Sequence, residues 1–98
     1  MEVTLNRNGS SLVAVVEGRI NTATAPQLEE KLVPALDGVT DLAIDMSGLN
    51  YISSAGLRVV LTTQKVMSKQ GSMKLCGLRP EVLEVFEMTG FADFLDIE

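Results

Sequence analysis

Residues 41–61, DLAIDMSGLNYISSAGLRVVL, place a strand pattern directly before a helix pattern. The apolar run from Asp41 to Met46 predicts a strand. After the polar stretch YISSAG (51–56), apolar residues recur at helical spacing and predict a helix from about 55 to 70, which Gly71 ends. The stripe of this helix that should face the core contains Leu57, Val60, Leu61 and Met67.

The residues that follow predict another strand and another helix. Met73 to Cys76 is a fourth strand, and Pro80 and Gly90 bracket a third helix, because proline suits the first helical position and glycine the position just past the end. The tail, FADFLDIE, is long enough only for a last brief strand. In the third helix the predicted inward residues are Val82, Leu83 and Phe86, and the predicted acidic outer face is Glu81, Glu84 and Glu87.

The N-terminal residues predict a β-hairpin. Residues 2–7 and 11–17 are rich in strand formers and are joined by Asn8-Gly9, which favours a type I′ turn with two positive φ angles. The second arm, Leu12 to Val16, is continuously apolar, which suits a central strand covered on both faces.

A helix is predicted over 25–36. Thr24 and Gln27 have the spacing of a capping box, and Leu28, Leu32 and Leu36 repeat at intervals of four. Pro34 conflicts with this pattern because proline removes a helical hydrogen bond at a cost of about 3 kcal/mol. We therefore expect a kink or an early stop near Val33.

The element order is ββαβαβα, in which strands and helices alternate after the hairpin. Such a chain forms an α/β fold with a mixed, largely parallel sheet of four to five strands, an N-terminal β-hairpin and right-handed crossovers through the interspersed helices. A length of 98 residues allows one domain spanning 1–98 and leaves no room for a second.

The amino-acid composition argues against several classes of function. The net charge is −5 and the eight basic residues are scattered, so we expect no nucleic-acid partner and favour protein partners. No signal peptide or membrane span is present in the sequence, which predicts a cytoplasmic protein without a membrane partner. No histidine occurs, which excludes imidazole zinc sites and Ser-His-Asp triads. The single cysteine, Cys76, is predicted to be a buried small side chain rather than a reactive thiol.

The serines at the strand-helix junction have a structural interpretation and several functional ones. Ser54 is placed to cap the following helix through its own oxygen. A nucleophile elbow would need glycine where Ile52 stands, and no nucleotide-binding loop motif is present. Asp45 lies near a strand end as in phosphoaspartate receivers, but the ends of the first two strands offer only Glu17 as a further acid for Mg²⁺. The remaining interpretation is a phosphoserine, whose charge a helix N-terminus can hold.

Several segments resemble a known family. DMSGLNYISSAGLRVVL (45–61) resembles the motif D-x-S-x-x-x-[YF]-[IM]-D-S-[SA]-G-L of bacterial anti-sigma-factor antagonists, the single-domain STAS proteins. VEGRIN (16–21) resembles the family's L-x-G-x-[LI]-D, and 71–90 resembles its C-terminal pattern. The resemblance thus extends through the chain.

The resemblance implies a partner-switching protein without enzymatic activity or a cofactor. The unphosphorylated antagonist binds an anti-sigma factor, which is also a serine kinase with a histidine-kinase-like ATPase fold, and so frees a sigma factor. Phosphorylation breaks the complex, and a PP2C-type phosphatase restores it. The matching phosphoacceptor is Ser54, with Ser53 as the less favoured alternative. The family's acidic residue before the acceptor is Ser53 here, and its loop aspartate is Asn21.

The predicted partner surface combines the loop before the first helix with the start of the second. Its residues are Asn21, Thr22, Ser53, Ser54, Gly56 and Arg58. Arg58 is solvent-facing by periodicity, so it could equally be an ordinary surface residue, and Gly56 could serve packing rather than the approach of a partner. The alternative function is a constitutive interaction or scaffold module of the same fold, in which the serines only cap the helix.

Overall fold

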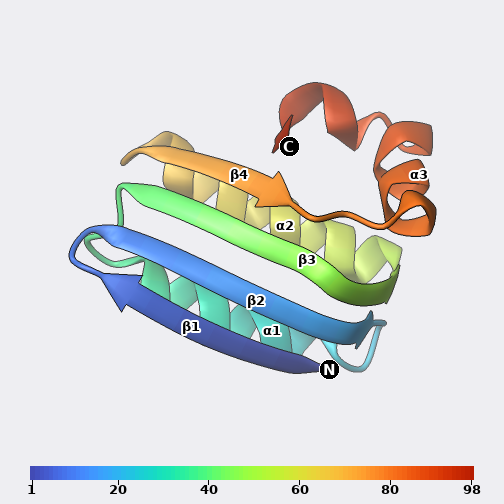
Figure 1. The fold of residues 1–98 in the computed structure, drawn as a ribbon, viewed down its shortest axis with the longest axis horizontal. Helices are drawn as coiled ribbons and strands as arrows, with labels where there is room; N and C mark the ends of the chain where they lie inside the picture. The colour runs from blue at the N-terminus through green and yellow to red at the C-terminus, as the bar shows by residue number, and fades with distance from the viewer.

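The computed structural model describes residues 1–98. Its five strands form one sheet with the order β1-β2-β3-β4-β5 (Figure 1). The hairpin strands β1 and β2 are antiparallel, and every other neighbouring pair is parallel, which confirms the predicted mixed sheet. The elements are β1 (Glu2–Asn8), β2 (Ser11–Ile20), α1 (Ala25–Leu32), η1 (Val33–Leu36), β3 (Asp41–Ile52), α2 (Ser54–Ser68), β4 (Ser72–Cys76), α3 (Pro80–Met88), η2 (Phe91–Phe94) and β5 (Asp96–Ile97), where η marks a 3₁₀ helix.

The helices α1 and α2 cover one face of the sheet and leave the other face open (Figure 1). Along β2, Leu12, Ala14 and Val16 are buried, whereas Val13 is 40% exposed. The prediction that this strand is covered on both faces is therefore wrong. The strand order explains why, because two right-handed crossovers that advance in the same direction, β2 to β3 and β3 to β4, put both helices on the same side.

The hairpin is confirmed, but its turn is not type I′. Asn8 pairs with Ser11, so the loop residues are Gly9 and Ser10 rather than Asn8 and Gly9. Only Gly9 has a positive φ, of 63°, whereas a type I′ turn needs two. Arg7 fixes the turn to the η1 end, because its guanidinium donates hydrogen bonds to the Gly9 and Asp37 carbonyls, both at 2.9 Å.

Proline divides the first helical segment as expected. α1 ends at Leu32, and Pro34 lies in the 3₁₀ turn η1. Leu28, Leu32 and Leu36 are each 1% exposed, so the leucine repeat faces the core through both pieces.

The second helix ends slightly earlier than predicted, and Gly71 has a different role. Gly71 does not adopt a positive φ. A Cβ at this position would lie 1.9 Å from the Thr40 carbonyl oxygen, so the residue is small because the chain before β3 passes against it.

The C-terminal elements agree with the sequence pattern except at one residue. α3 begins at Pro80 and is followed by Gly90 with a φ of 79°, and Val82 and Phe86 are fully buried. Leu83, which was also predicted to face inward, is only half-buried. β5 pairs briefly with β4, as the tail predicted. None of the helices has both the length and the apolar character needed to cross a bilayer.

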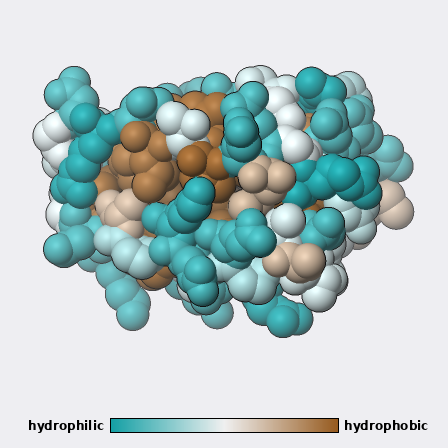
Figure 2. All heavy atoms as spheres, turned by 90° about the horizontal axis from the view of Figure 1, so that it is seen from below, coloured by the Kyte–Doolittle hydropathy of each residue, from teal (hydrophilic) through white to brown (hydrophobic).

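The β1 edge carries a partly open apolar surface. Val3 and Leu5 pair with Val16 and Ala14, so they lie on the helix-covered side, but Leu5 is still 38% exposed. Figure 2 views the molecule from below the orientation of Figure 1, toward the β1 edge, and shows a hydrophobic patch framed by polar side chains.

Candidate functional site

The N-terminus of α2 begins one residue earlier than predicted, and Ser53 rather than Ser54 is the cap. The Ser53 backbone is extended (φ −91°, ψ 174°), and its Oγ accepts a hydrogen bond from the Gly56 N–H at 3.3 Å. The prediction that Ser54 caps the helix is therefore wrong. β3 continues to Ile52, well past the apolar run that marked the strand, so the extended conformation lasts until Ser53.

Ser54 is the first helical residue, and its side chain is exposed. It takes no part in the cap, because Ser53 supplies the capping oxygen. The hydroxyl of Ser54 is therefore accessible at the positive end of a 15-residue helix.

The loop before α1 lies beside this helix start. The Ser53 N–H donates to the Ile20 carbonyl at 2.8 Å, which joins the end of β3 to the end of β2. Asn21 follows Ile20 directly, and Thr22 is exposed beyond it. The structure thus brings the two predicted halves of the partner surface together at one end of the sheet.

Asn21 has a structural role in this loop. Its Oδ1 accepts hydrogen bonds from the Ala23 N–H at 2.9 Å and the Thr24 N–H at 3.0 Å. Thr24 does not form the predicted capping box with Gln27, since its Oγ1 accepts from the Asn21 N–H at 2.8 Å and donates to the Arg19 carbonyl at 3.0 Å. The loop is therefore held by its own side chains.

Gly56 is buried and faces the sheet. A Cβ at this position would lie 2.7 Å from Ile20 Cγ2 and 2.7 Å from Ile52 Cγ1. Close packing of the first helical turn on the two strand ends explains this glycine, so the packing alternative fits Gly56 better than contact with a partner.

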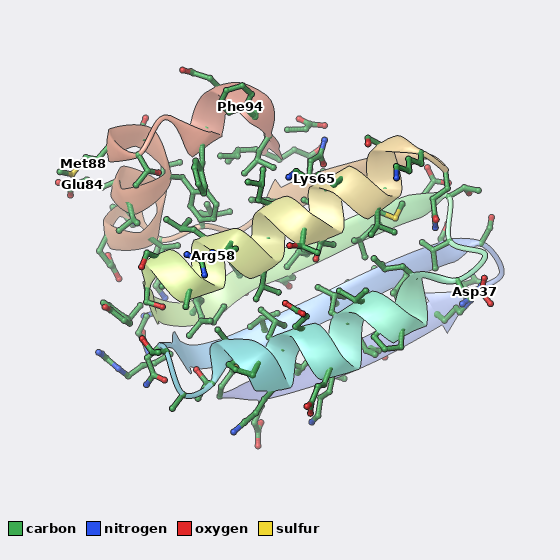
Figure 3. The ribbon with its side chains drawn as sticks, turned by 180° about the vertical axis from the view of Figure 1, so that it is seen from behind. Asp37, Arg58, Lys65, Glu84, Met88 and Phe94 are labelled. Atoms are coloured by element: carbon green, nitrogen blue, oxygen red, sulfur yellow. The ribbon has the colours of Figure 1, made fainter.

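Arg58 is exposed on the outer face of α2, one turn after Ser54 (Figure 3). It lines a shallow groove of about 290 Å³ between α1 and the first turns of α2. Sequence reasoning named two of the lining residues, Thr22 and Arg58, and missed the acidic wall that α1 contributes. The groove is lined by Thr22, Ala25, Pro26, Glu29, Glu30, Ala55, Arg58 and Val59.

Sequence reasoning also missed a pair on the open face of the sheet at the same end. The Arg19 guanidinium lies over the Tyr51 ring, 4.4 Å from its centroid. The two residues are register partners on β2 and β3, and Tyr51 is 40% exposed. The contact can be predicted once the register between β2 and β3 is known. The sequence pattern of either strand alone does not indicate it.

Two further ionisable groups lie on the open face. The backbone N–H of Ser47 donates to Asp45 Oδ1 at 2.9 Å, and this hydrogen bond lowers the pKa of the Asp45 carboxyl. Burial, with a smaller contribution from the Asp45 charge, raises the pKa of the Cys76 thiol. Cys76 is only half-buried, less than predicted, but its raised pKa agrees with an unreactive side chain. No group of three or more histidine, cysteine, aspartate or glutamate side chains is arranged to hold a metal ion.

Comparison with known proteins gives one consistent picture. The STAS domain model matches residues 2–98. BtrV of Bordetella bronchiseptica, provisionally named an anti-sigma factor antagonist, is 41% identical over 99% of this chain and 85% of its own length. The anti-sigma-B factor antagonist of Bacillus subtilis is 36% identical over 99% of this chain and 90% of its own length.

A solved structure shares the fold. The crystal structure of an anti-sigma factor antagonist from Mycobacterium paratuberculosis matches with a TM-score of 0.89 at 23% identity. The match covers 98% of this chain and 83% of the other.

Proposed function

The chain belongs to the STAS domain family of anti-sigma factor antagonists, and from this we propose that it acts as a single domain that binds an anti-sigma factor and so frees a sigma factor. The anti-sigma factor is also a serine kinase with a histidine-kinase-like ATPase fold. It phosphorylates Ser54 with ATP, the phosphate breaks the complex, and a PP2C-type phosphatase restores it. The domain acts by binding rather than by catalysis.

The exposure of Ser54 beside an independent cap is the observation that carries this proposal. Because Ser53 satisfies the Gly56 N–H, a phosphate on Ser54 removes no hydrogen bond from the fold. A phosphoserine carries about −1.5 to −2 charges at neutral pH, and the helix N-terminus favours negative charge. The fold therefore tolerates the modification, and the change is confined to the outer surface.

That surface is continuous with the groove between α1 and α2. Ala55 and Arg58 line the groove directly after Ser54, and Thr22 lines it from the other side. A partner that packs over Ser54 would have to bury a new dianion, and an uncompensated buried charge costs several kcal/mol. Since each 1.4 kcal/mol changes affinity tenfold, one phosphate is enough to release the partner.

A constitutive binding module is the second candidate, and two observations favour it. The family's two acidic positions near the acceptor are the neutral residues Ser53 and Asn21 here. Both have hydrogen-bonding roles in the fold, Ser53 as the cap and Asn21 as the loop acceptor. A kinase that recognises acidic neighbours would find none at these positions.

Phosphorylation mapping separates the two candidates. The purified protein is incubated with ATP and each histidine-kinase-like ATPase, and any phosphate is located by tandem mass spectrometry, with Ser54→Ala and Ser53→Ala as controls. We expect phosphate on the wild type and on Ser53→Ala but not on Ser54→Ala. Ser54→Asp should bind the partner at least about tenfold more weakly than Ser54→Ala. Equal binding of both variants, with no phosphate transfer, would contradict the switch and support the constitutive module.

A further inference from the structure

We propose that Arg58 pairs with the phosphate on Ser54, so that phosphorylation also withdraws the one cationic side chain of the α1–α2 groove from the partner surface. This inference rests on the proposed phosphorylation of Ser54. It gives the switch two components, an added anion at Ser54 and a cation removed from the groove.

The helix places the two side chains together. Ser54 and Arg58 are four residues apart in α2, and both are exposed. Side chains at this spacing have Cβ atoms about 5–6 Å apart, and an anion on the N-terminal side of a cation is the more favourable order. Long helical side chains lean toward the helix N-terminus, so we expect Arg58 to lean toward the turn that Ser54 begins. Figure 3 shows Arg58 in the first half of α2.

Arg58 is free to take this role in the unmodified protein. It forms no hydrogen bond or ion pair, and the one salt bridge of the structure joins Lys74 and Glu98 at 3.6 Å. The other charged residues that line the groove are Glu29 and Glu30 on α1, and neither forms an ion pair with Arg58. The guanidinium therefore has no partner to leave when a phosphate arrives.

The other arginines at this end of the sheet are already engaged. Arg19 lies over the Tyr51 ring, and the two residues are on the open face, away from the helices. Arg79 donates to the Ser47 carbonyl at 2.9 Å and to Asn50 Oδ1 at 2.7 Å. Arg58 is thus the cation available to a phosphate on Ser54.

The pairing changes the charge that the groove presents. In the unmodified protein the groove has an acidic wall, Glu29 and Glu30, and a cationic wall, Arg58. When Arg58 turns to the phosphate, the two glutamates remain and the cation is neutralised. A partner carboxylate that contacts Arg58 in the complex then loses its counter-charge.

Titration of the phosphate tests the pairing without any partner protein. Phosphoserine is incorporated at position 54 during translation, and the phosphate pKa is followed by ³¹P NMR in the wild type, in Arg58→Gln and in Lys65→Gln as a matched control on the same helix. A nearby cation favours the dianion, so we expect the wild-type pKa to be about 0.3 units lower than in Arg58→Gln. Lys65→Gln should titrate like the wild type, and ~1 M salt should remove the difference.

Identical phosphate pKa values in the wild type and in Arg58→Gln would overturn the inference. Because the phosphoserine is supplied during synthesis, this result is independent of any kinase. A lower wild-type pKa together with no kinase-dependent phosphorylation would support the pairing and contradict the proposed switch. Identical pKa values together with kinase-dependent phosphorylation of Ser54 would support the proposed switch and contradict the role of Arg58 in it.

Discussion

The Oγ of Ser53 accepts a hydrogen bond from the backbone N–H of Gly56, 3.3 Å away, and closes the first turn of α2. The adjacent Ser54 is exposed and outside this bond. Of the two neighbouring serines, Ser53 therefore has a role in stability, whereas the side chain of Ser54, which we propose is phosphorylated, has no hydrogen-bonding role in the fold.

Replacement of each serine by alanine should separate these roles. Ser53→Ala loses the capping oxygen, and loss of an N-cap side chain lowers the free energy of unfolding by about 0.5–2 kcal/mol. Ser54→Ala removes an exposed hydroxyl and should change it by less than about 0.5 kcal/mol. Urea unfolding followed by circular dichroism measures both variants. Greater destabilisation by Ser54→Ala would show that Ser54 is the cap in solution.

Gly56→Ala tests the packing of α2 on the strand ends. Alanine in a helix is intrinsically favoured over glycine by up to about 1 kcal/mol. Here the new Cβ would lie 2.7 Å from both Ile20 Cγ2 and Ile52 Cγ1, and overpacking of a core costs about 1–3 kcal/mol. We expect a net destabilisation of about 1 kcal/mol in urea unfolding. The exposed site Lys65→Ala is the control on the same helix, and a stabilised Gly56→Ala would contradict the packing.

The order and type of the elements could be predicted because local signals agree with the tertiary structure. Pro34 ends α1, and Pro80 and Gly90 bracket α3, through constraints that act within a few residues of each. The YISSAG segment contains the boundary between β3 and α2, which lies at Ser53.

Three features could not be predicted from the sequence, because each depends on contacts between segments that are distant in the chain. The uncovered face of the sheet follows from the strand order, which no single strand pattern contains. Ser53 rather than Ser54 caps α2 because the Ser53 N–H donates a hydrogen bond to the Ile20 carbonyl. This bond extends β3 beside β2. The acidic wall of the groove appears only when α1 and α2 are packed side by side.

The side-chain oxygen of Asn21 should stabilise the loop more than its side-chain NH₂ group does. Asn21→Ala removes the acceptor of two backbone N–H groups, from Ala23 and Thr24, and should lower the free energy of unfolding by about 1–2 kcal/mol. Asn21→Asp keeps the Oδ1 atom that accepts both hydrogen bonds and adds negative charge near the start of α1, which is favourable by about 0.3–1 kcal/mol. Urea unfolding at neutral pH compares the two variants. Equal stability of Asn21→Ala and the wild type would show that these bonds do not form in solution.

Cys76 should react slowly with alkylating reagents. Burial raises the pKa of its thiol, so less thiolate is present near neutral pH than for a free cysteine, and the thiolate is the nucleophile. We expect iodoacetamide to modify the folded protein more slowly than glutathione at pH 8, as followed by mass spectrometry. In urea the two rates should converge. If folded Cys76 reacts as fast as glutathione, the result would contradict the raised pKa of its thiol.

Asp45 should make the stability of the fold depend on pH in the acid range. The Ser47 N–H holds the pKa of its carboxyl below the ordinary value of 3.8 in the folded state. Above that value the carboxylate is charged in both the folded and unfolded chains, and its full stabilisation is present. As the pH falls toward the folded-state pKa, the unfolded chain takes up the proton first, so the stabilisation is lost.

Asp45→Asn removes this titration but keeps an oxygen that can accept from the Ser47 N–H. We expect the drop in free energy of unfolding between pH 7 and pH 3, measured with urea, to be smaller in Asp45→Asn than in the wild type. Asp93→Asn, at an exposed aspartate in η2, controls for the loss of one negative charge from a chain whose net charge is −5. If Asp45→Asn loses as much stability in acid as the wild type, the hydrogen bond from Ser47 does not favour the ionised carboxylate in solution.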